Sequence, residues 1–383
     1  MKQPIMGNFQ GTISATSINI ASILNSPSIA PKAFSVDTEN RCVLICPASG
    51  TFRNLHIRTN GFTTFRLTLR VNGSDSSLVA STSSSQTGFD ISNSVNVNSG
   101  DLLSFGTSGG CVDLGWGLAF TPSVERENIL MGSVNTFELA TGNAHGCPLN
   151  GCHSTQNGES GEFDYQIAPM GGTLSNLMVF AFGMTGRTIN IMKNGATALV
   201  SGFGGTATVE EGDRLWVAIN SGAVGNGYVS WGVIFTPNLN SGSPLMMVHS
   251  SAMDSSSSEF AGVNGSAEFG TTSASVRNEC PGNFEFYNLK SAVSYAPGAG
   301  TSWKFTVRKN SIAQTLSNFI IGTQNENSNS INTFSANSGD DLEVMVTPSN
   351  TPLVFNGTNT LASRVSMVAL DNDDVERPII FHV

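Results

Sequence analysis

The sequence predicts an all-β protein made of three tandem antiparallel β-sandwich domains of jelly-roll type. Charged residues form only 12% of the 383 residues, and Ser, Asn, Thr and Gly fill the spaces between apolar residues, which is typical of short strands joined by tight turns. Apolar and polar residues alternate over several runs, and one order of turn signals recurs three times. The length leaves room for two or three domains, each with its own core.

The recurring turn signals define the repeats. Repeat one contains Cys46-Pro47, Asn54-Leu55, Asn72-Gly73, Gly100-Asp101, Trp116-Gly117 and Phe120-Thr121-Pro122. Repeat two has Ala168-Pro169, Asn176-Leu177, Asn194-Gly195, Gly212-Asp213, Trp231-Gly232 and Phe235-Thr236-Pro237. Repeat three keeps Cys280-Pro281, Asn288-Leu289 and Gly339-Asp340, but has Asn310-Ser311 and Val365-Ser366-Met367 in the places of Asn-Gly and Trp-Gly. The predicted domains are therefore residues 1–124, 125–240 and a divergent 241–370, followed by a tail at 371–383.

Alternation predicts the same strands in each repeat. Apolar residues at every second position between 65 and 71 end at Asn72-Gly73, which is a strong hairpin signal. The equivalent runs are 189–191 and 303–307, and further strands follow the Gly-Asp turns at 215–219 and 342–346. Because aspartate beside glycine is typical of turns, we expect Asp101, Asp213 and Asp340 to make turns, not to catalyse.

The charge balance excludes several functions. A net charge of -10 and a pI near 4.9 argue against binding to nucleic acid, which needs clustered Lys and Arg. We expect no membrane insertion, because no apolar run approaches the roughly 18 residues that span a bilayer. The first residues lack the apolar run of a secretory signal, so we expect synthesis in the cytoplasm and reduced cysteines.

The turn signals also carry a resemblance. The order Asn-Leu, Lys193-Asn194-Gly195, Gly-Asp-x-Leu and Phe-Thr-Pro resembles a module of phage structural proteins and of bacterial exosporium and collagen-linked surface proteins. That module is similar to the compact jelly roll of the tumour-necrosis-factor and complement C1q superfamily, which implies trimers. Tandem jelly rolls also resemble the penton, turret, fibre and decoration proteins of icosahedral viruses.

The resemblance implies a virion structural protein, assembled in the host cytoplasm, that acts as a decoration, turret, fibre or spike subunit. Its expected partners are further copies of itself in a homotrimer, other virion proteins, and a host receptor or glycan. We expect no enzyme activity and no cofactor, because none of the five histidines lies in a catalytic signature. The alternative is a bacterial cell-surface or exosporium adhesin that binds glycans or a receptor, and a tail-borne glycan hydrolase comes third.

One short segment contains four possible metal ligands: His145, Cys147, Cys152 and His153. Zinc takes four nitrogen or sulfur ligands in a tetrahedron, and one Gly-rich loop could supply them. The alternatives are a disulfide between Cys147 and Cys152, or thiols beside two exposed histidines. Cys42, Cys46, Cys111 and Cys280 are expected to remain thiols.

Three further segments carry weaker expectations. The Ser-rich tracts 81–85 and 255–258 are interpreted as loops between strands. The acidic run 371–374 could bind calcium, although a short acidic run is more often a solvated terminus. The apolar end Pro378–Val383 predicts a strand that docks on a neighbouring subunit or domain.

Overall fold

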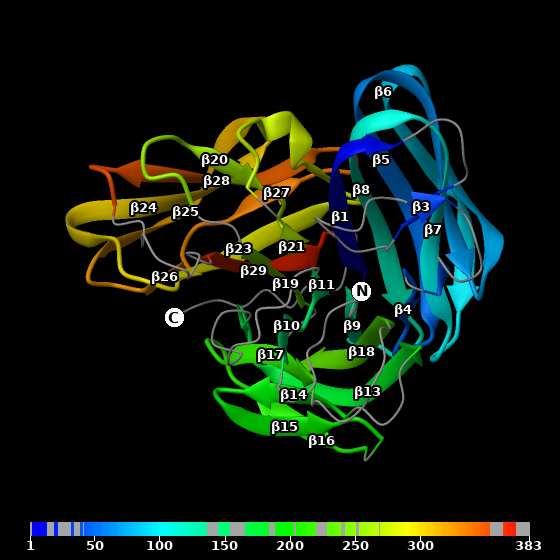
Figure 1. Cartoon of the computed structure of the whole chain (residues 1–383), viewed down its shortest axis with the longest axis horizontal. Helices are drawn as coiled ribbons and strands as arrows, with labels where there is room; N and C mark the ends of the chain where they lie inside the picture. The colour runs from blue at the N-terminus through cyan, green and yellow to red at the C-terminus, as the bar shows by residue number, and fades with distance from the viewer. Residues whose placement is uncertain are drawn as a thin grey trace.

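The computed structural model describes residues 2–13, 19–21, 32–33, 39–40, 42–135, 145–153, 165–183, 188–202, 204–219, 228–238, 242–249, 253–267, 269–352 and 363–372. The protein is all-β, and its sandwich sheets confirm the predicted fold class. Figure 1 shows three lobes around a common centre, formed in turn by repeat one (blue to cyan), repeat two (green) and repeat three (yellow to red).

Repeat one forms a single eight-stranded sheet that curls into two layers. Its strands are β1 (Gln3–Ile13), β2 (Asn19–Ala21), β3 (Lys32–Ala33), β4 (Leu44–Ile45), β5 (Gly50–Val71), β6 (Ser74–Val97), β7 (Leu102–Gly109) and β8 (Cys111–Pro122). The first part of β5 pairs with β8 and its last part pairs with β7, so one long strand passes through both layers.

Repeat two forms two five-stranded sheets. Its strands are β9 (Asn128–Asn135), β10 (His145–Pro148), β11 (Gly151–His153), β12 (Gln166–Ile167), β13 (Gly172–Phe182), β14 (Ile189–Lys193), β15 (Ala196–Val200), β16 (Thr206–Val209), β17 (Arg214–Ile219) and β18 (Tyr228–Pro237). One sheet has the order β11-β9-β18-β13-β16, and the other has β10-β17-β14-β15 with β12 also on β17.

Repeat three forms a six-stranded and a five-stranded sheet. Its elements are β19 (Gly242–His249), β20 (Glu259–Ala261), β21 (Gly265–Ala267), the short 3-10 helix η1 (Ser273–Ser275), β22 (Asn278–Glu279), β23 (Phe284–Val293), β24 (Gly298–Lys309), β25 (Ile312–Gly322), β26 (Glu326–Asn329), β27 (Phe334–Ala336), β28 (Asp341–Ser349) and β29 (Ser363–Asp371). The sheet orders are β21-β19-β29-β23-β26 and β20-β28-β24-β25, with β27 on β23 and β22 on β28.

The strand order is the same in each repeat, although periodicity alone could not predict it. The first strand pairs with the last, as β1-β8, β9-β18 and β19-β29, and the last strand then pairs with β5, β13 or β23. Strands that are distant in sequence are thus neighbours, as in a jelly roll. The long β5 corresponds to two separate strands in each of the other repeats, which explains why only repeat one forms a continuous sheet.

Three details differ from the prediction or bear on it. The pairs β9 with β11 and β19 with β21 are parallel, so the sheets are not purely antiparallel. The Ser81–Ser85 tract lies within β6 and is not a loop, because Ser81, Thr82 and Ser85 pair with β5, although the burial alternation of Leu78 and Ala80 ends at Thr82. Residues 255–258 do lie between strands, as expected, with bends at 255–257.

The three repeats close into a ring. The short strand β4 of repeat one packs against β18 of repeat two, β12 of repeat two packs against β29 of repeat three, and β22 of repeat three packs against β8 of repeat one. We call these contacts the first joint, the second joint and the seam. Residues 123–127 and 238–241 link the repeats across the first and second joints, whereas the seam joins the first and last repeats of the chain.

Candidate functional site at the joints between repeats

One asparagine side chain crosses each joint to a proline carbonyl. These residues are the asparagine of each Asn-Leu pair and the proline of each Cys-Pro or Ala-Pro pair. Their Nδ2 to O distances are 2.6 Å for Asn176 to Pro47 in the first joint, 2.5 Å for Asn288 to Pro169 in the second joint, and 3.1 Å for Asn54 to Pro281 in the seam. The motifs that define the repeats therefore also join them.

The backbone at these asparagines explains why the chain uses this residue type. Asn54, Asn176 and Asn288 have φ angles of 55°, 53° and 53°, in the left-handed region that asparagine tolerates better than most residues. Each lies at a shift in strand register, as between Ser175 and Met178. Because a bulge redirects the side chain, the amide points out of its own repeat toward the repeat that precedes it in the ring.

Equivalent glycines in repeats one and two allow close backbone approach across the joints. A Cβ atom on Gly232 would lie 2.3 Å from the carbonyl oxygen of Ile45, and one on Gly117 would lie 1.8 Å from that of Glu279. These are the glycines of the Trp-Gly pairs. Repeat three has Ser366 in the same place, where its buried Oγ has no hydrogen-bond partner among the described residues.

One methionine from the first strand of each repeat packs into the core of a neighbouring repeat. Met131 of repeat two is 1% exposed and lies in the core of repeat one. Met246 of repeat three lies in the core of repeat two, and Met6 of repeat one lies in that of repeat three. The three cores therefore share side chains in the same cyclic order as the joints.

The residue two positions after each bulged asparagine differs between joints. In the first joint Ser99 Oγ lies 3.3 Å from Met178 Sδ, and in the second joint Lys290 Nζ lies 2.9 Å from Glu211 Oε1. In the seam His56 Nε2 lies 2.8 Å from Ser338 Oγ. The partner in each case precedes a Gly-Asp turn, so equivalent places hold three unlike pairs.

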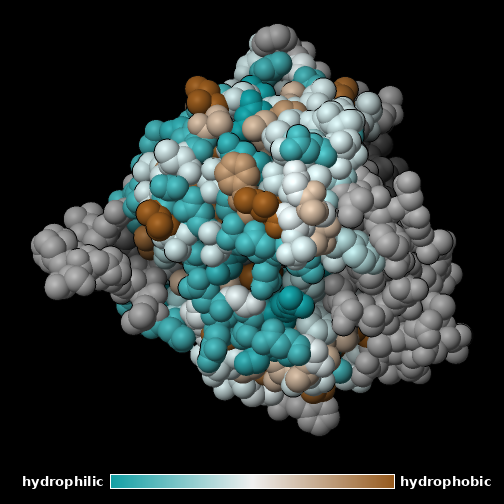
Figure 2. All heavy atoms as spheres, turned by 90° about the vertical axis from the view of Figure 1, so that its left-hand side faces the viewer, coloured by the Kyte–Doolittle hydropathy of each residue, from teal (hydrophilic) through white to brown (hydrophobic). Residues whose placement is uncertain are grey.

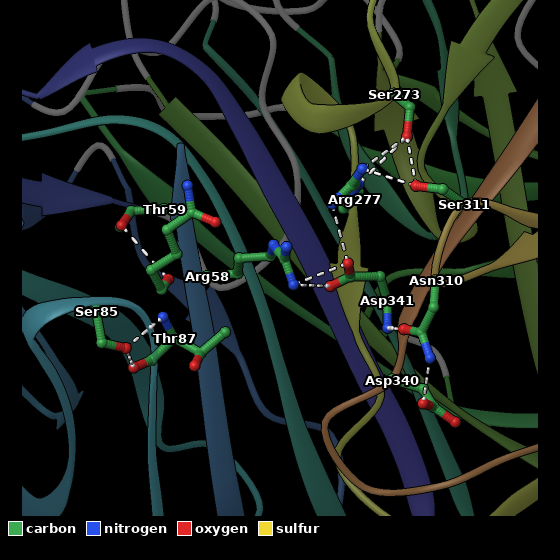
Figure 3. Close-up of polar contacts among 11 residues, drawn as sticks. Arg58, Thr59, Ser85, Thr87, Ser273, Arg277, Asn310, Ser311, Asp340 and Asp341 are labelled. Atoms are coloured by element: carbon green, nitrogen blue, oxygen red, sulfur yellow. Dashed lines mark hydrogen bonds and ion pairs between the residues drawn. The ribbon is translucent and has the colours of Figure 1, made fainter. Parts of the chain in front are cut away.

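The seam also contains a buried charged cluster, drawn in Figure 3. Arg58 of repeat one points to Asp341 of repeat three, with Nη1 2.9 Å from Oδ2, and Arg277 Nη1 lies 3.1 Å from the same oxygen. Arg277 also donates to Ser273 and Ser311. Asp341 therefore accepts from one guanidinium of its own repeat and from one of the neighbouring repeat.

Burial raises the proton affinity of two glutamates, Glu279 and Glu343. Glu279 lies beside Asp341 in strand register and is 1% exposed. Its burial, followed by the hydrogen bond and repulsion from Asp341, raises its pKa well above the ordinary value, despite Arg58 and Arg277. Burial also raises the pKa of Glu343, whose Oε1 lies 2.9 Å from Arg308 Nη1.

Burial acts in the opposite direction on the imidazole in the seam. It lowers the pKa of His56 to about 4, so the ring is neutral at neutral pH. The ring also stacks on Phe89, with centroids 5.9 Å apart.

The second joint has an apolar cluster where the seam has charges. Counted from the shared motifs, Tyr165, Ile167 and Ala292 occupy the places of Arg277, Glu279 and Arg58. Together with Trp216 and Met192 they form a small separate core between repeats two and three. The seam therefore differs in chemistry from a joint of the same geometry.

The predicted metal ligands do not lie in one loop. His145 and Cys147 lie on β10, which pairs with β17, whereas Cys152 and His153 lie on β11, which pairs with β9 in the other sheet. The expectation of a loop was wrong, because both short segments complete sheet edges. Cys147 is buried in the core of repeat two, and the side chains of the other three lie outside the described part, so zinc and the disulfide remain predictions.

Other expected residues take structural places. Cys46, Cys111 and Cys280 are buried thiols. The turn aspartates accept from main-chain amides: Asp101 from Asn98 at 2.7 Å, Asp213 from Glu210 at 2.8 Å and Asp340 from Asn337 at 2.8 Å. The predicted turn role is confirmed.

The structure describes only the first two residues of the acidic run and none of the apolar end. Asp371 accepts from the main-chain nitrogen of Lys2 at 2.8 Å, so its carboxylate lies at a contact between repeats. Residues 373–383, including the apolar end, lie outside the described part, and strand docking stays a prediction.

The face of the molecule drawn in Figure 2 is mainly hydrophilic in its described part. Figure 2 shows apolar side chains scattered over it, and the exposed ones on and near β25 are Ile312, Phe319, Ile321 and Ile331. No helix in the described ranges is long and apolar enough to cross a bilayer.

Comparison with known proteins gives no family: no family model matches the chain, and no curated protein matches it significantly.

Proposed function

We propose that this protein is a virion structural protein, a decoration, turret, fibre or spike subunit that acts through surface contact. The observation that carries the proposal is the closed ring of three jelly-roll repeats, which brings into one chain the trimeric arrangement that the resemblance implies. Fusion of three copies fixes their number and order, and a unit of this shape suits a position of three-fold symmetry on a shell.

The composition supports the same proposal. A surface rich in Ser, Thr and Asn with few charges suits close packing against neighbouring proteins, and the net charge of -10 disfavours a role on the genome. The contacts between repeats occupy the inner surfaces of the ring, so virion partners and a receptor or glycan would contact the outer surfaces. A homotrimer of whole chains remains a prediction and would also use those surfaces.

Electron microscopy of particles from the native source, with an antibody against the protein, tests the proposal. We expect label on the particle surface at positions of one symmetry type. Label confined to a bacterial envelope or spore coat would refute the virion role and favour the adhesin.

A further inference from the structure

We propose that the outer face of repeat one has a binding site for an acidic sugar, that is, a sugar residue that carries both a carboxylate and hydroxyl groups. The site is a hollow of about 260 Å³ over β5 and β7. The inference deepens the proposed function, because it gives a place and a chemistry to the contact with a glycan. Its test uses the purified chain and does not depend on a place on a virion.

The hollow lies on the polar face of a strand whose other face is in the core. Alternate apolar residues of β5 between 65 and 69 are buried in the core of repeat one. Successive side chains of a strand point to opposite faces, so the polar residues between them lie on the outer face. Strands β6 and β7 pair with this part of β5 on its two sides. The polar lining of the hollow consists of Arg66, Thr68, Arg70, Asp75, Gly106 and Ser108.

One arginine forms a fixed wall of the hollow. Arg70 Nε lies 2.8 Å from Glu39 Oε1, and Arg70 Nη1 also binds Asp75 Oδ1. The Arg70 side chain passes close over Gly106, where a Cβ atom would lie 3.0 Å from Arg70 Cδ. Asp75 Oδ2 makes no hydrogen bond within the described residues, so it can accept from a ligand hydroxyl.

A second arginine supplies the cation for a ligand. Arg66 is exposed, and within the described residues its guanidinium makes one hydrogen bond, from Nε to Thr68 Oγ1 at 3.4 Å. A guanidinium binds a carboxylate through two parallel hydrogen bonds, which this arginine has free donors to make. The exposed Ser108 pairs with Arg66 in strand register and adds a hydroxyl beside it.

The equivalent face of repeat three has neither the glycine nor a cation without a partner. Counted from the shared hairpin turns, Lys304 takes the place of Arg66 and Met345 takes that of Gly106. Lys304 Nζ lies 5.2 Å from the centroid of the Phe319 ring, so this cation is already engaged. Met345 places a side chain where repeat one has none. The two features therefore belong to repeat one and are not a general property of the fold.

The lining selects an acidic sugar over a simple anion or a neutral sugar. A ligand carboxylate would pair with Arg66, while ligand hydroxyls would bind the hydroxyls of Thr68 and Ser108 and the carboxylate of Asp75. A simple anion would be repelled by Asp75 without using it, and a neutral sugar would leave Arg66 without an anion. Pockets for drug-sized ligands measure about 300 to 1,000 Å³, so this smaller hollow suits a single sugar residue. Sialic acids and uronic acids share this chemistry.

A ligand-observed nuclear magnetic resonance titration of the whole chain tests the site. The probes are the methyl glycosides of N-acetylneuraminic acid and of glucuronic acid, with methyl glucoside as the uncharged counterpart of the glucuronide. We expect an acidic probe to bind with a Kd of about 1 to 10 mM, because one sugar buries little surface. Methyl glucoside should bind at least about tenfold more weakly than the glucuronide or the sialoside. The acidic probe that binds more tightly identifies the class of glycan.

Three variants locate the binding. Arg66→Gln should weaken it at least about tenfold, because the charged donors are lost. Gly106→Met should abolish it by filling the hollow, and repeat three already has Met345 at this place, so the fold accommodates the side chain. Arg214→Gln removes an exposed arginine of repeat two and should bind like the wild type.

Three results would overturn the inference: no binding of either acidic probe at about 20 mM, equal binding of the glucuronide and the glucoside, or wild-type binding by Arg66→Gln. If Gly106→Met does not fold, Arg66→Gln still decides, because it changes an exposed side chain. The two proposals fail separately. Label on the particle surface without sugar binding refutes this site alone, and sugar binding without label on particles refutes the virion role alone.

Discussion

Replacing Met131 by alanine tests whether the three cores unfold together. Met131 belongs to repeat two but lies in the core of repeat one, at 1% exposure. Loss of a buried methionine side chain typically costs about 2 to 5 kcal/mol, and about 3 kcal/mol is a central expectation. Met131→Leu, which nearly conserves volume, should cost less than about 1.5 kcal/mol and serves as the control.

The size of the cooperative unit decides how far the melting temperature moves. With an unfolding entropy of about 2.1 cal/mol/K per residue, the whole ring has about 0.8 kcal/mol/K and a single repeat of about 115 residues has about 0.24 kcal/mol/K. A loss of about 3 kcal/mol therefore lowers Tm by about 4 °C if the ring unfolds as one unit, and by about 12 °C if one repeat unfolds alone. Scanning calorimetry distinguishes these two shifts in Tm. Separate transitions, only one of which moves by the larger amount, would refute the shared cores.

Further predictions concern the joints. Gly117→Ala should destabilise by about 1 to 3 kcal/mol in urea unfolding, because its Cβ would lie 1.8 Å from the carbonyl oxygen of Glu279; wild-type stability would contradict this approach. Ser366→Ala should stabilise by about 1 kcal/mol, since it removes a buried hydroxyl without a partner among the described residues, and a loss would show that the hydroxyl is bonded. Because the pKa of Glu279 is raised, its contribution to stability is lost as pH rises from about 4.5 through the raised value. Glu279→Gln should therefore flatten the fall in unfolding free energy above pH about 4.5, measured by urea unfolding; an unchanged slope would contradict it. The pKa of His56 is lowered, so its effect on stability has the opposite pH dependence. Its contribution is lost as pH falls from about 6.5 through about 4, by at most about 3 kcal/mol. His56→Met, which introduces the residue that repeat two has at position 178, should remove that loss if burial is its cause.

Local patterns predicted individual strands and turns well because each motif reports local backbone geometry. The alternation at 65–71 and 303–307 placed strands that lie in β5 and β24, and the Gly-Asp turns bind main-chain amides as expected. The Ser-rich tract in β6 was assigned to a loop because composition outweighed alternation. Leu78 and Ala80 carried the signal that would have corrected it.

The ring could not be predicted because it depends on contacts between distant parts of the chain. Asn54, Asn176 and Asn288 were recognised as repeat markers, but nothing local indicates that their amides reach a neighbouring repeat. A signal for the seam was nevertheless present: Glu279 stands where the other repeats have Ile45 and Ile167. When one repeat has a charged residue at a position that is apolar in the other two, that residue indicates a different neighbour for that repeat.

Small-angle X-ray scattering of the purified chain at low concentration tests the closed ring most directly. A compact chain of 383 residues has a radius of gyration of about 21 Å, which the ring predicts. Three repeats in line would give about 30 Å or more and an extended distribution of interatomic distances. A value near 21 Å supports three repeats closed on each other, and a value near 30 Å would contradict the joints on which the account depends.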